Sequence, residues 1–530
     1  MNVREAVYDL LRARGITTVF GNPGSTELPF LSGFPSDFRY VLGLQEAVVV
    51  AMADGYAQAS GQTTLVNLHT APGVGNAMGS VINANANKAP LLLTAGQQVR
   101  AQVTMEALLT NPDAASLPRP AVKWSYEPPR PEDVPAAFVR AASIAQTPPR
   151  GPVFLSIHMD DWQKDVDDVA TRYVANRSVN ARTAPDPAAI EDIASKLAAA
   201  SNPALVVGAE IDAAGAWGAA TSLAERLALP VWGAPLEARL GFPQDHPNYQ
   251  GDLAPGIAML GAQLEGHDFV LVIGAAVFRY YPYVPGAFLP EGASLVMITT
   301  DPLEAARAPV GDAVLGDVAL ALEALLGRTT PTDTRPAPAV RPGPAETGDS
   351  EPLSSGAVFA TLREVFPDDG AIVLESPSNT PVLRDQLRIS RPNSYFFCAG
   401  GGLGFGMGAT VGVQLAMPDR PVVGVIGDGS AQYAITALWT AAANDVPVTF
   451  LVPRNDEYAI LKWFGEFEQV SGVPGLDVPG IDNVSLARGY GVPARRVESR
   501  EELHAALEED IPAAGPRLIE VPIQPGMSFP

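Results

Sequence analysis

Short apolar runs alternate with helical patterns along the whole chain. Runs of four to seven mostly apolar residues, bounded by turn residues, are typical of strands buried on both faces of a parallel sheet. Such runs predict strands at residues 17–20, 64–68, 91–95, 151–157, 204–208, 229–232, 269–274, 295–298, 371–374, 422–426, 448–452 and 518–521. Helices are expected between them, among others at residues 3–14, 46–59 and 431–442. The alternation predicts an α/β fold with parallel sheets.

Two breaks in this pattern divide the chain into three units. The apolar pattern thins out over residues 160–185, and residues 327–352 are dense in proline and threonine, a composition that does not form packed structure. We therefore predict an N-terminal domain over residues 1–175, a middle domain over 185–328, a linker over 329–352 and a C-terminal domain over 353–530.

Composition narrows the functional classes. The 530 residues carry 35 Lys and Arg against 58 Asp and Glu, a net charge of −23, which argues against binding nucleic acid or an anionic membrane. The single cysteine excludes an internal disulfide framework, and none of the five histidines are spaced i, i+4 as in a helical zinc site. The chain starts without the apolar core of a signal peptide, and its most apolar run is about ten residues. We expect a soluble, cytoplasmic protein.

A glycine-rich turn with an acid follows the strand at 422–426. Asp428 lies in this turn as a hard oxygen ligand, and the glycines on either side let the backbone approach a phosphate. Asn455 follows the next strand 27 residues later, so the two strand ends are expected side by side. The Asp428 carboxylate, the Asn455 amide oxygen and the Glu457 carbonyl would form half of an octahedron for Mg²⁺, with Ca²⁺ as a possible substitute. The alternative is an ordinary strand–turn–helix unit with Asp428 as a helix cap.

A second acidic position stands out in the first third of the chain. Glu46 begins an almost wholly apolar helix, where a buried carboxylate is costly unless it is paired or protonated. The simpler interpretation is a half-exposed glutamate in the first turn, favoured by the helix dipole. The turn at Asp428 and this glutamate together favour a catalytic role for Glu46.

These two motifs, with GNPGSTELPF at residues 21–30, resemble the benzoylformate decarboxylase family of thiamine-diphosphate-dependent 2-keto acid decarboxylases. The resemblance runs nearly the full length and includes the blocks LQEA, NLHTA, TAGQQ, EALLTN, LPRP, KWSYEP, DPLEAARAP, GGLGF, SAQYAITALWT and VPGLDVPGID. It implies three doubly wound parallel-sheet domains: one that binds the pyrimidine, a middle domain, and one that binds the diphosphate. It also implies thiamine diphosphate and Mg²⁺ as cofactors, and a homotetramer (a dimer of dimers) with each cofactor held between two subunits.

The resemblance assigns a role to each matching residue. Glu46 would hydrogen-bond N1′ of the aminopyrimidine and activate the cofactor, while Ser25 and His69 would orient the substrate carboxylate and move protons. Gly401 would offer its carbonyl to the 4′-amino group, and Leu403 would be wedged between the two rings. The cofactor-binding positions implied are Asn22, Pro23, Gly24, Asn76, Pro377, Ser378, Gly401, Leu403, Gly427, Asp428, Gly429, Ser430, Tyr433, Asn455, Tyr458 and Ile460.

The substrate pocket implied by the resemblance is formed by Phe397, Cys398, Ile460 and Phe464. Simpler structural roles exist for several of these assignments. Ser25 is suited to cap a helix, Leu403 to a turn that packs into the core, and Cys398 to a buried apolar thiol. A lone histidine such as His69 is often structural, although a strand end in a chain with so few histidines favours catalysis.

The chain departs from the family pattern at several positions. Tyr281 stands where the family has a second catalytic histidine, and a phenol is a weaker proton shuttle near neutral pH than imidazole. We expect this change to slow protonation after CO₂ loss and to favour carboligation. Ile460 and Pro377 replace smaller or hydroxylated pocket residues, which makes an aliphatic substrate credible beside an aromatic one. Arg454 and Glu457 also differ from the family, which usually has an asparagine and a small residue at these two positions, respectively.

The predicted function is non-oxidative decarboxylation of an aromatic, benzoylformate-like 2-keto acid to the aldehyde and CO₂, with carboligation as a side activity. The alternatives are an acyloin-forming synthase or lyase, a decarboxylase of aliphatic 2-keto acids, and a non-catalytic homologue that binds the cofactor. A nicotinamide dehydrogenase is disfavoured because no G-x-G-x-x-G turn follows a strand with an acid about 20 residues on.

Overall fold

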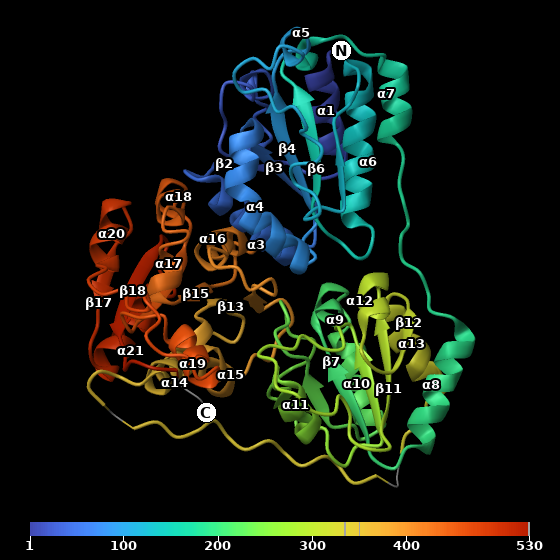
Figure 1. Ribbon diagram of the computed structural model, residues 1–530, viewed down its shortest axis with the longest axis vertical. Helices are drawn as coiled ribbons and strands as arrows, with labels where there is room; N and C mark the ends of the chain where they lie inside the picture. Colours follow the sequence, from blue (N-terminus) through green and yellow to red (C-terminus); the bar gives the residue numbers. More distant parts are fainter. Residues whose placement is uncertain (333–334, 349, 528–530) are drawn as a thin grey trace. The chain divides into compact units, whose positions relative to one another are not determined.

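The computed structural model describes residues 1–332, 335–348 and 350–527. Its residues cluster into two compact units, one made of Met1–Asn180, Glu346–Gln386 and Gly400–Pro530, the other of Ala181–Ala345 and Leu387–Ala399. The first unit holds two α/β domains and the second holds one, so the described chain contains three domains with parallel sheets (Figure 1). The domain boundaries predicted from the sequence remain predictions.

The N-terminal domain is a six-stranded parallel sheet in the order β2-β1-β3-β4-β6-β5. Its strands are β1 (Thr18–Gly21), β2 (Arg39–Leu42), β3 (Thr64–Leu68), β4 (Leu91–Gln97), β5 (Trp124–Tyr126) and β6 (Val153–His158). Its helices are α1 (Val3–Ala13), α2 (Leu28–Leu31), α3 (Glu46–Ser60), α4 (Thr70–Ala86), α5 (Arg100–Val103), α6 (Val134–Gln146) and α7 (Asp168–Ala175), with 3₁₀ turns η1 (Pro131–Asp133) and η2 (Asp161–Gln163). Helices α1 and α6 cover one face, and α3 and α4 cover the other (Figure 1).

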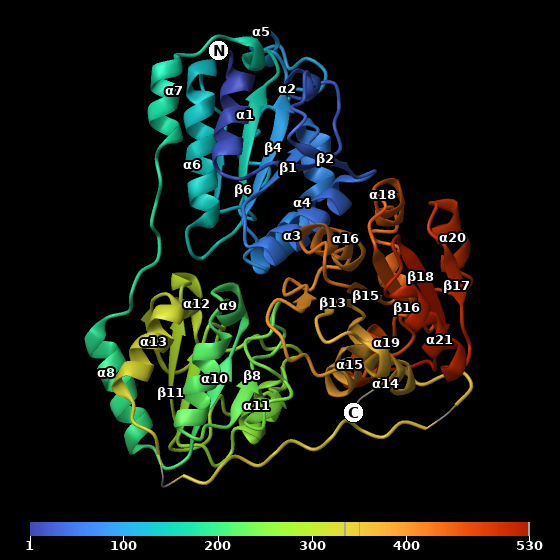
Figure 2. The same cartoon turned by 180° about the vertical axis from the view of Figure 1, so that it is seen from behind.

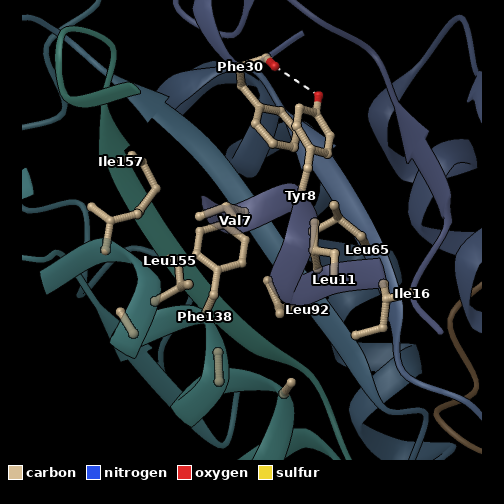
Figure 3. Packing of buried hydrophobic residues seen from close by; sticks show 14 of the residues in the cluster. Val7, Tyr8, Leu11, Ile16, Phe30, Leu65, Leu92, Phe138, Leu155 and Ile157 are labelled. Carbon is tan, nitrogen blue, oxygen red and sulfur yellow. Dashed lines mark hydrogen bonds between the residues drawn. The ribbon is translucent and has the colours of Figure 1, made fainter. Parts of the chain in front are cut away.

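The core under α1 follows from the spacing of its apolar residues. Val7 and Leu11 lie one turn apart on the same face and are at most 2% exposed. They pack against Leu155 of β6 and Phe138 of α6 (Figure 3). Tyr8 is buried beside them, and its hydroxyl donates a 2.8 Å hydrogen bond to the carbonyl of Phe30. Each of these large apolar side chains contributes about 1.5–3 kcal/mol through burial, which fixes α1 on the sheet.

The middle domain is a six-stranded parallel sheet in the order β12-β11-β10-β7-β8-β9. Its strands are β7 (Pro203–Val207), β8 (Val231–Gly233), β9 (Tyr249–Asp252), β10 (Phe269–Ile273), β11 (Ser294–Thr299) and β12 (Asp312–Leu315). Its helices are α8 (Pro187–Ala199), α9 (Ala209–Ala213), α10 (Trp217–Arg226), α11 (Ile257–Gln263), α12 (Pro302–Arg307) and α13 (Val318–Arg328). A short strand, β14 (Tyr395–Phe397), belongs to the same unit.

The C-terminal domain shares its unit with the N-terminal domain, and its strands there follow the order β13-β15-β16-β18-β17. These strands are β13 (Ala371–Glu375), β15 (Val422–Ile426), β16 (Val448–Arg454), β17 (Ala494–Arg496) and β18 (Arg517–Pro522). The helices are α14 (Ser355–Val365), α15 (Thr380–Gln386), α16 (Gly406–Ala416), α17 (Asp428–Ala431), α18 (Ala437–Ala443), α19 (Ala459–Phe467), α20 (Asn483–Gly489) and α21 (Arg500–Asp510), with 3₁₀ turn η3 (Pro377–Asn379). Helix α16 packs on α3 of the N-terminal domain, and both views show the two helices adjacent (Figures 1 and 2).

The continuous helix predicted over residues 431–442 is wrong. The structure instead has the short α17, a turn, and then α18. Within the turn, backbone N–H groups donate to carbonyls three residues earlier, as from Gln432 to Gly429 and from Tyr433 to Ser430. The amide side chain of Gln432 also donates to the Asp428 carbonyl and to Asn483. These contacts hold the chain in tight turns between α17 and α18. The alanine content of this segment therefore predicts a longer helix than the structure contains.

Across the part of the chain that the structure describes, we find no helix of the length and hydropathy that crossing a bilayer requires.

Candidate functional site

An open pocket of about 380 Å³ lies at the carboxyl ends of β13, β15 and β16. These strands are neighbours in a parallel sheet, so the turns that follow them meet at one edge, where ligands bind in doubly wound folds. The pocket is lined by Ser376, Pro377, Ser378, Asn379, Leu403, Gly427, Asp428, Gly429, Ser430, Pro453, Asn455, Glu457, Tyr458, Ala459 and Ile460. It therefore brings together most of the cofactor-binding residues predicted for this domain, and all three predicted metal ligands.

Asp428 begins α17, directly after β15, and only 3% of the residue is exposed. Its Oδ1 accepts a 2.9 Å hydrogen bond from the Gly429 N–H, and its Oδ2 accepts a 2.8 Å bond from the Asp456 N–H. Burial raises the pKa of the Asp428 carboxyl, while these two backbone bonds lower it. The two N–H groups fix the orientation of a carboxylate that a bound cation would stabilise in its charged form.

Asn455 and Glu457 lie on the turn after β16. The Asn455 amide oxygen accepts a hydrogen bond from the Glu457 N–H at 3.3 Å. The Glu457 side chain is engaged elsewhere, because it pairs with Lys462 and its Oε1 accepts a 2.6 Å bond from the Gly526 N–H. This supports ligation through the Glu457 backbone carbonyl, for which the side-chain type matters little. The three groups form a set of hard oxygens with one carboxylate, which suits Mg²⁺.

The rest of the pocket fits an anionic group. The buried amide oxygen of Asn379, which has no hydrogen-bond partner among the described residues, is an acceptor and suits a cation or a donor rather than the anion itself. Ser378 and Ser430 also line the pocket. A Cβ on Gly429 would lie 2.7 Å from the Tyr458 ring, so this position needs glycine for the backbone to pack there. Hydroxyls, backbone N–H groups and a hard-oxygen set in one pocket match a metal-bound diphosphate.

Gly401 and Leu403 lie on the loop before α16, and Leu403 lines the pocket. Two groups that the sequence interpretation missed hold this loop. Glu375, at the end of β13, accepts hydrogen bonds from the N–H groups of Phe405 and Gly406 at 2.9 and 3.1 Å. Asn83 of α4 bonds both the carbonyl and the N–H of Gly402. The loop is therefore anchored on both domains of its unit.

The buried Glu375 makes stability pH-dependent. Desolvation raises the pKa of Glu375 to about 7, with the backbone bonds opposing it. Because the folded pKa lies above the unfolded one, the stability this group contributes is present below about pH 4.5 and lost as the pH rises through about 7. We expect Glu375→Gln to reduce the fall in unfolding free energy between pH 5 and 8 by up to about 3 kcal/mol. Denaturant unfolding of wild type and Glu375→Gln across this pH range measures the unfolding free energy of each. If the free energy changes equally with pH in the two proteins, the prediction is wrong.

A second cluster of predicted residues lies in the N-terminal domain. It lies near β1, where the order of strands in the parallel sheet reverses: β2 is on one side of β1 and β3 on the other. Glu46 begins α3 and is 9% exposed, so the helix start is buried as predicted. Its Oε2 accepts a 3.2 Å hydrogen bond from the amide of Asn76 on α4. Two predicted residues, Glu46 and Asn76, are thus brought together. Asn22, Pro23 and Ser25 lie on the turn after β1, with Ser25 exposed.

His69 lies between β3 and α4, and its hydrogen-bond partner is a residue that the sequence analysis did not identify. His69 Nδ1 lies 2.8 Å from Oε2 of Glu27, whose side chain is 1% exposed. Glu27 also accepts hydrogen bonds from the N–H groups of Gly24 and Gly96, at 2.9 and 2.8 Å, and from the Thr26 hydroxyl. Because Glu27 serves as an acceptor throughout, we assign Nδ1 as the protonated nitrogen. A Cβ on Gly24 would lie 2.0 Å from the imidazole, so glycine is required there.

The remaining predicted residues lie outside these two clusters. Tyr433 does not line the pocket, although Tyr458 does. Tyr281 lies in the second unit, is 62% exposed, and its N–H donates to the Pro255 carbonyl at 2.9 Å. Of the four predicted substrate-pocket residues, Phe397 and Cys398 belong to the second unit and Ile460 and Phe464 to the first. Their grouping in one substrate pocket stays a prediction.

Three family models match the chain. They are the thiamine pyrophosphate enzyme N-terminal TPP binding domain over residues 1–117, the central domain over residues 190–325, and the C-terminal TPP binding domain over residues 378–521. Together with the three parallel sheets, these matches show that the chain belongs to the thiamine pyrophosphate enzymes. The fold class predicted from the sequence and its resemblance is confirmed.

Individual relatives narrow the family. The chain is 49% identical to a benzoylformate decarboxylase of Pseudomonas aeruginosa, covering 98% of this chain and 99% of that protein. Two solved structures superpose with a TM-score of 0.97 over the full length of both chains: a thiamine diphosphate-dependent 4-hydroxybenzoylformate decarboxylase of Rhodococcus jostii RHA1 (46% identical) and a benzoylformate decarboxylase of Polynucleobacter necessarius (44%). Within the thiamine pyrophosphate enzymes, the chain belongs to the benzoylformate decarboxylase family of carboxy-lyases, as the motifs indicated.

Proposed function

We propose that this protein is a thiamine-diphosphate- and Mg²⁺-dependent decarboxylase of an aromatic 2-keto acid of the benzoylformate type, which releases the aldehyde and CO₂. The main observation behind this proposal is a single pocket that is lined by Asp428, Asn455 and Glu457 and by the turn after β13. The similarity to benzoylformate decarboxylases over the full length supports the aromatic substrate. Carboligation between aldehydes is proposed as a side activity.

In this proposal the pocket residues bind the cofactor. Asp428, Asn455 and the Glu457 carbonyl hold Mg²⁺, while Ser378 and Ser430 contact the diphosphate. Thiamine diphosphate, when bound, supplies the electron sink for the pair that remains when CO₂ departs. The fixed orientation of Asp428, set by the Gly429 and Asp456 N–H groups, keeps the anchor in place before the cofactor arrives.

The N-terminal cluster handles protons. Glu46 would give and take a proton at its carboxyl when the aminopyrimidine is bound, and the Asn76 amide, which donates to Oε2, keeps that carboxyl oriented. His69 has Nδ1 bound to Glu27, which leaves Nε2 as the nitrogen that exchanges a proton with substrate or product. The exposed Ser25 orients the substrate carboxylate by hydrogen bonding. These roles follow the residue correspondences with the family.

Substrate size is set by the pocket wall. Ile460 and Pro377 line the pocket together with Leu403. We propose that they narrow the space beside the reacting carbon, while Phe397 and Phe464 supply the aromatic surface for a phenyl ring. Decarboxylation of an aliphatic 2-keto acid is the alternative, since extra methylenes in the wall change relative rates by about 1–3 kcal/mol.

The assembly proposed is a homotetramer, a dimer of dimers. Among the described residues, the pocket at Asp428 is lined by the C-terminal domain alone, and Glu46 is not part of that lining. We propose that Glu46 of a second copy completes each site. A cytoplasmic location remains a prediction.

A release assay tests this function. With thiamine diphosphate and Mg²⁺ present, we expect CO₂ from benzoylformate with a kcat/KM at least about 10-fold above that for pyruvate. Preference for pyruvate would favour the aliphatic alternative, and direct formation of 2-hydroxy ketones as the main product would favour a synthase. Cofactor binding with no CO₂ from any 2-keto acid would indicate a non-catalytic homologue.

A second activity is favoured by Tyr281, which stands at the position of a family histidine. An imidazole titrates near neutral pH and a phenol does not, so we expect slow protonation of the carbon that has lost CO₂ and time for a second aldehyde to bond to it. Tyr281→His should raise the ratio of aldehyde to 2-hydroxy ketone several-fold. Tyr283→His, at another exposed tyrosine two residues on, is the control and should leave the ratio unchanged. An equal ratio in wild type and Tyr281→His would reject the role.

A further inference from the structure

A buried acidic residue lies behind the turn that carries Asn455. Glu520, on β18, is 0% exposed. Its Oε1 accepts hydrogen bonds from Arg454 at 3.4 Å and from Arg496 at 2.7 Å, and its Oε2 accepts from the Asn483 amide at 2.9 Å. A carboxylate with this many donors on both oxygens is fixed in position and orients its partners in turn.

Arg454 connects this anchor to the turn. Its Nε and Nη2 donate to Oδ1 and Oδ2 of Asp456 at 2.9 and 3.0 Å, a two-pronged pairing across the intervening Asn455. Asp456 has a φ of +58°, a left-handed conformation that few residue types other than glycine adopt readily. Its N–H in this conformation donates to Oδ2 of Asp428. One chain of contacts therefore runs from Glu520 through Arg454 and Asp456 to Asp428.

We infer that Arg454 and Asp456 are positioning residues for the cation site: Arg454, held by Glu520, fixes the left-handed Asp456, whose N–H orients the Asp428 carboxylate. The inference rests on the proposed Mg²⁺ site at Asp428 and Asn455. Neither residue is a ligand in that proposal. Arg454 and Asp456 act by fixing the conformation of the turn. Their side chains pair with each other, and the proposed ligand Asn455 lies between them in the chain.

The chemistry of these residues suits the task. The planar guanidinium matches both oxygens of a carboxylate, and an ammonium in the same place offers only a point charge. Aspartate and asparagine tolerate the left-handed conformation better than other non-glycine residues. The Asp456 side chain is 39% exposed, so the pair contributes little to folding stability as an ion pair. Its effect should therefore appear in metal affinity rather than in overall stability.

The experiment measures the Mg²⁺ Kd of the full-length enzyme by calorimetry at a fixed, saturating concentration of thiamine diphosphate. Arg454→Lys keeps the positive charge but loses the two parallel hydrogen bonds to Asp456. Asp456→Asn can still adopt the left-handed backbone conformation but loses the negative charge. We expect each to weaken Mg²⁺ binding about 10- to 100-fold, the range for residues that orient metal ligands. The double variant should lose no more than the larger single loss, because the two residues act as one unit.

Arg496→Lys is the matched control, since Arg496 also binds Glu520 but does not contact the turn through any described bond to Asp456. Its Mg²⁺ Kd should change less than about threefold. Cofactor-free unfolding of each variant monitors folding, and kcat at saturating Mg²⁺ should recover to within about threefold of wild type because no reacting group is altered.

The outcomes separate two failures. If wild type binds Mg²⁺ and the Arg454 and Asp456 variants bind it equally well, the inference is wrong. A kcat that stays low at saturating Mg²⁺, or an Arg496 variant as weak as the others, also overturns it, because the defect is then general. If wild type binds no Mg²⁺ in the presence of thiamine diphosphate, the proposed function fails first.

Discussion

Glu46→Gln should lower kcat about 10²- to 10⁴-fold, which corresponds to about 3–5.5 kcal/mol of lost transition-state stabilisation. The amide keeps the size of the side chain and still accepts the hydrogen bond from Asn76, but it cannot exchange a proton. Because Glu46 is buried at the start of α3, bulk water replaces its carboxyl poorly. Steady-state kinetics with benzoylformate measures kcat, and calorimetry of thiamine diphosphate should show an affinity within about 10-fold of wild type.

The matched control lies on the same helix. Asp54 is also a buried carboxyl on α3, hydrogen-bonded to Gln58 and Asn87, and it has no proposed contact with the cofactor. Asp54→Asn should therefore leave kcat within about threefold of wild type, even if stability changes. A Glu46→Gln enzyme with kcat near that of wild type would remove Glu46 from the mechanism, and equal losses in both variants would point to damage of the helix.

The interior of each sheet was predictable from the sequence, whereas the edges were not. The twelve predicted strands coincide with β1, β3, β4, β6, β7, β8, β10, β11, β13, β15, β16 and β18. The strands that the apolar pattern missed include β2, β5, β9, β12 and β17, each at the end of a strand order. Interior strands such as β3 and β10 are buried at every residue, while β12 and β17 have no fully buried residue. An edge strand has one open side, so its sequence lacks the continuous apolar run.

The site shows the same limit for a different reason. Asp428 and Asn455 could be predicted to lie close together because each follows a buried strand and neighbouring strand ends must meet, and both line the same pocket. Glu27 lies within the GNPGSTELPF block, but its role was missed because that role arises from contacts with His69 and Gly96, 42 and 69 residues away. Glu375 was missed likewise, since its partners Phe405 and Gly406 lie about 30 residues on. Short-range patterns identify groups at strand ends, but they do not identify the residues that orient them.

Asp428→Asn should weaken Mg²⁺ binding about 100-fold or more, because it removes the only side-chain carboxylate in the proposed ligand set. The neutral amide can accept only with its oxygen, so one of the two backbone bonds, from Gly429 or Asp456, is also lost. Calorimetric titration of Mg²⁺ into protein with saturating thiamine diphosphate measures the loss.

Asp445→Asn provides the comparison for this variant. Asp445 is an exposed aspartate of the same domain with a φ of +49°, and it does not line the pocket, so its removal tests charge and backbone effects away from the ligands. The Mg²⁺ Kd of Asp445→Asn should match wild type within about twofold. If Asp428→Asn binds Mg²⁺ as well as Asp445→Asn does, the cation is held elsewhere, because loss of a charged ligand from a buried site cannot be neutral.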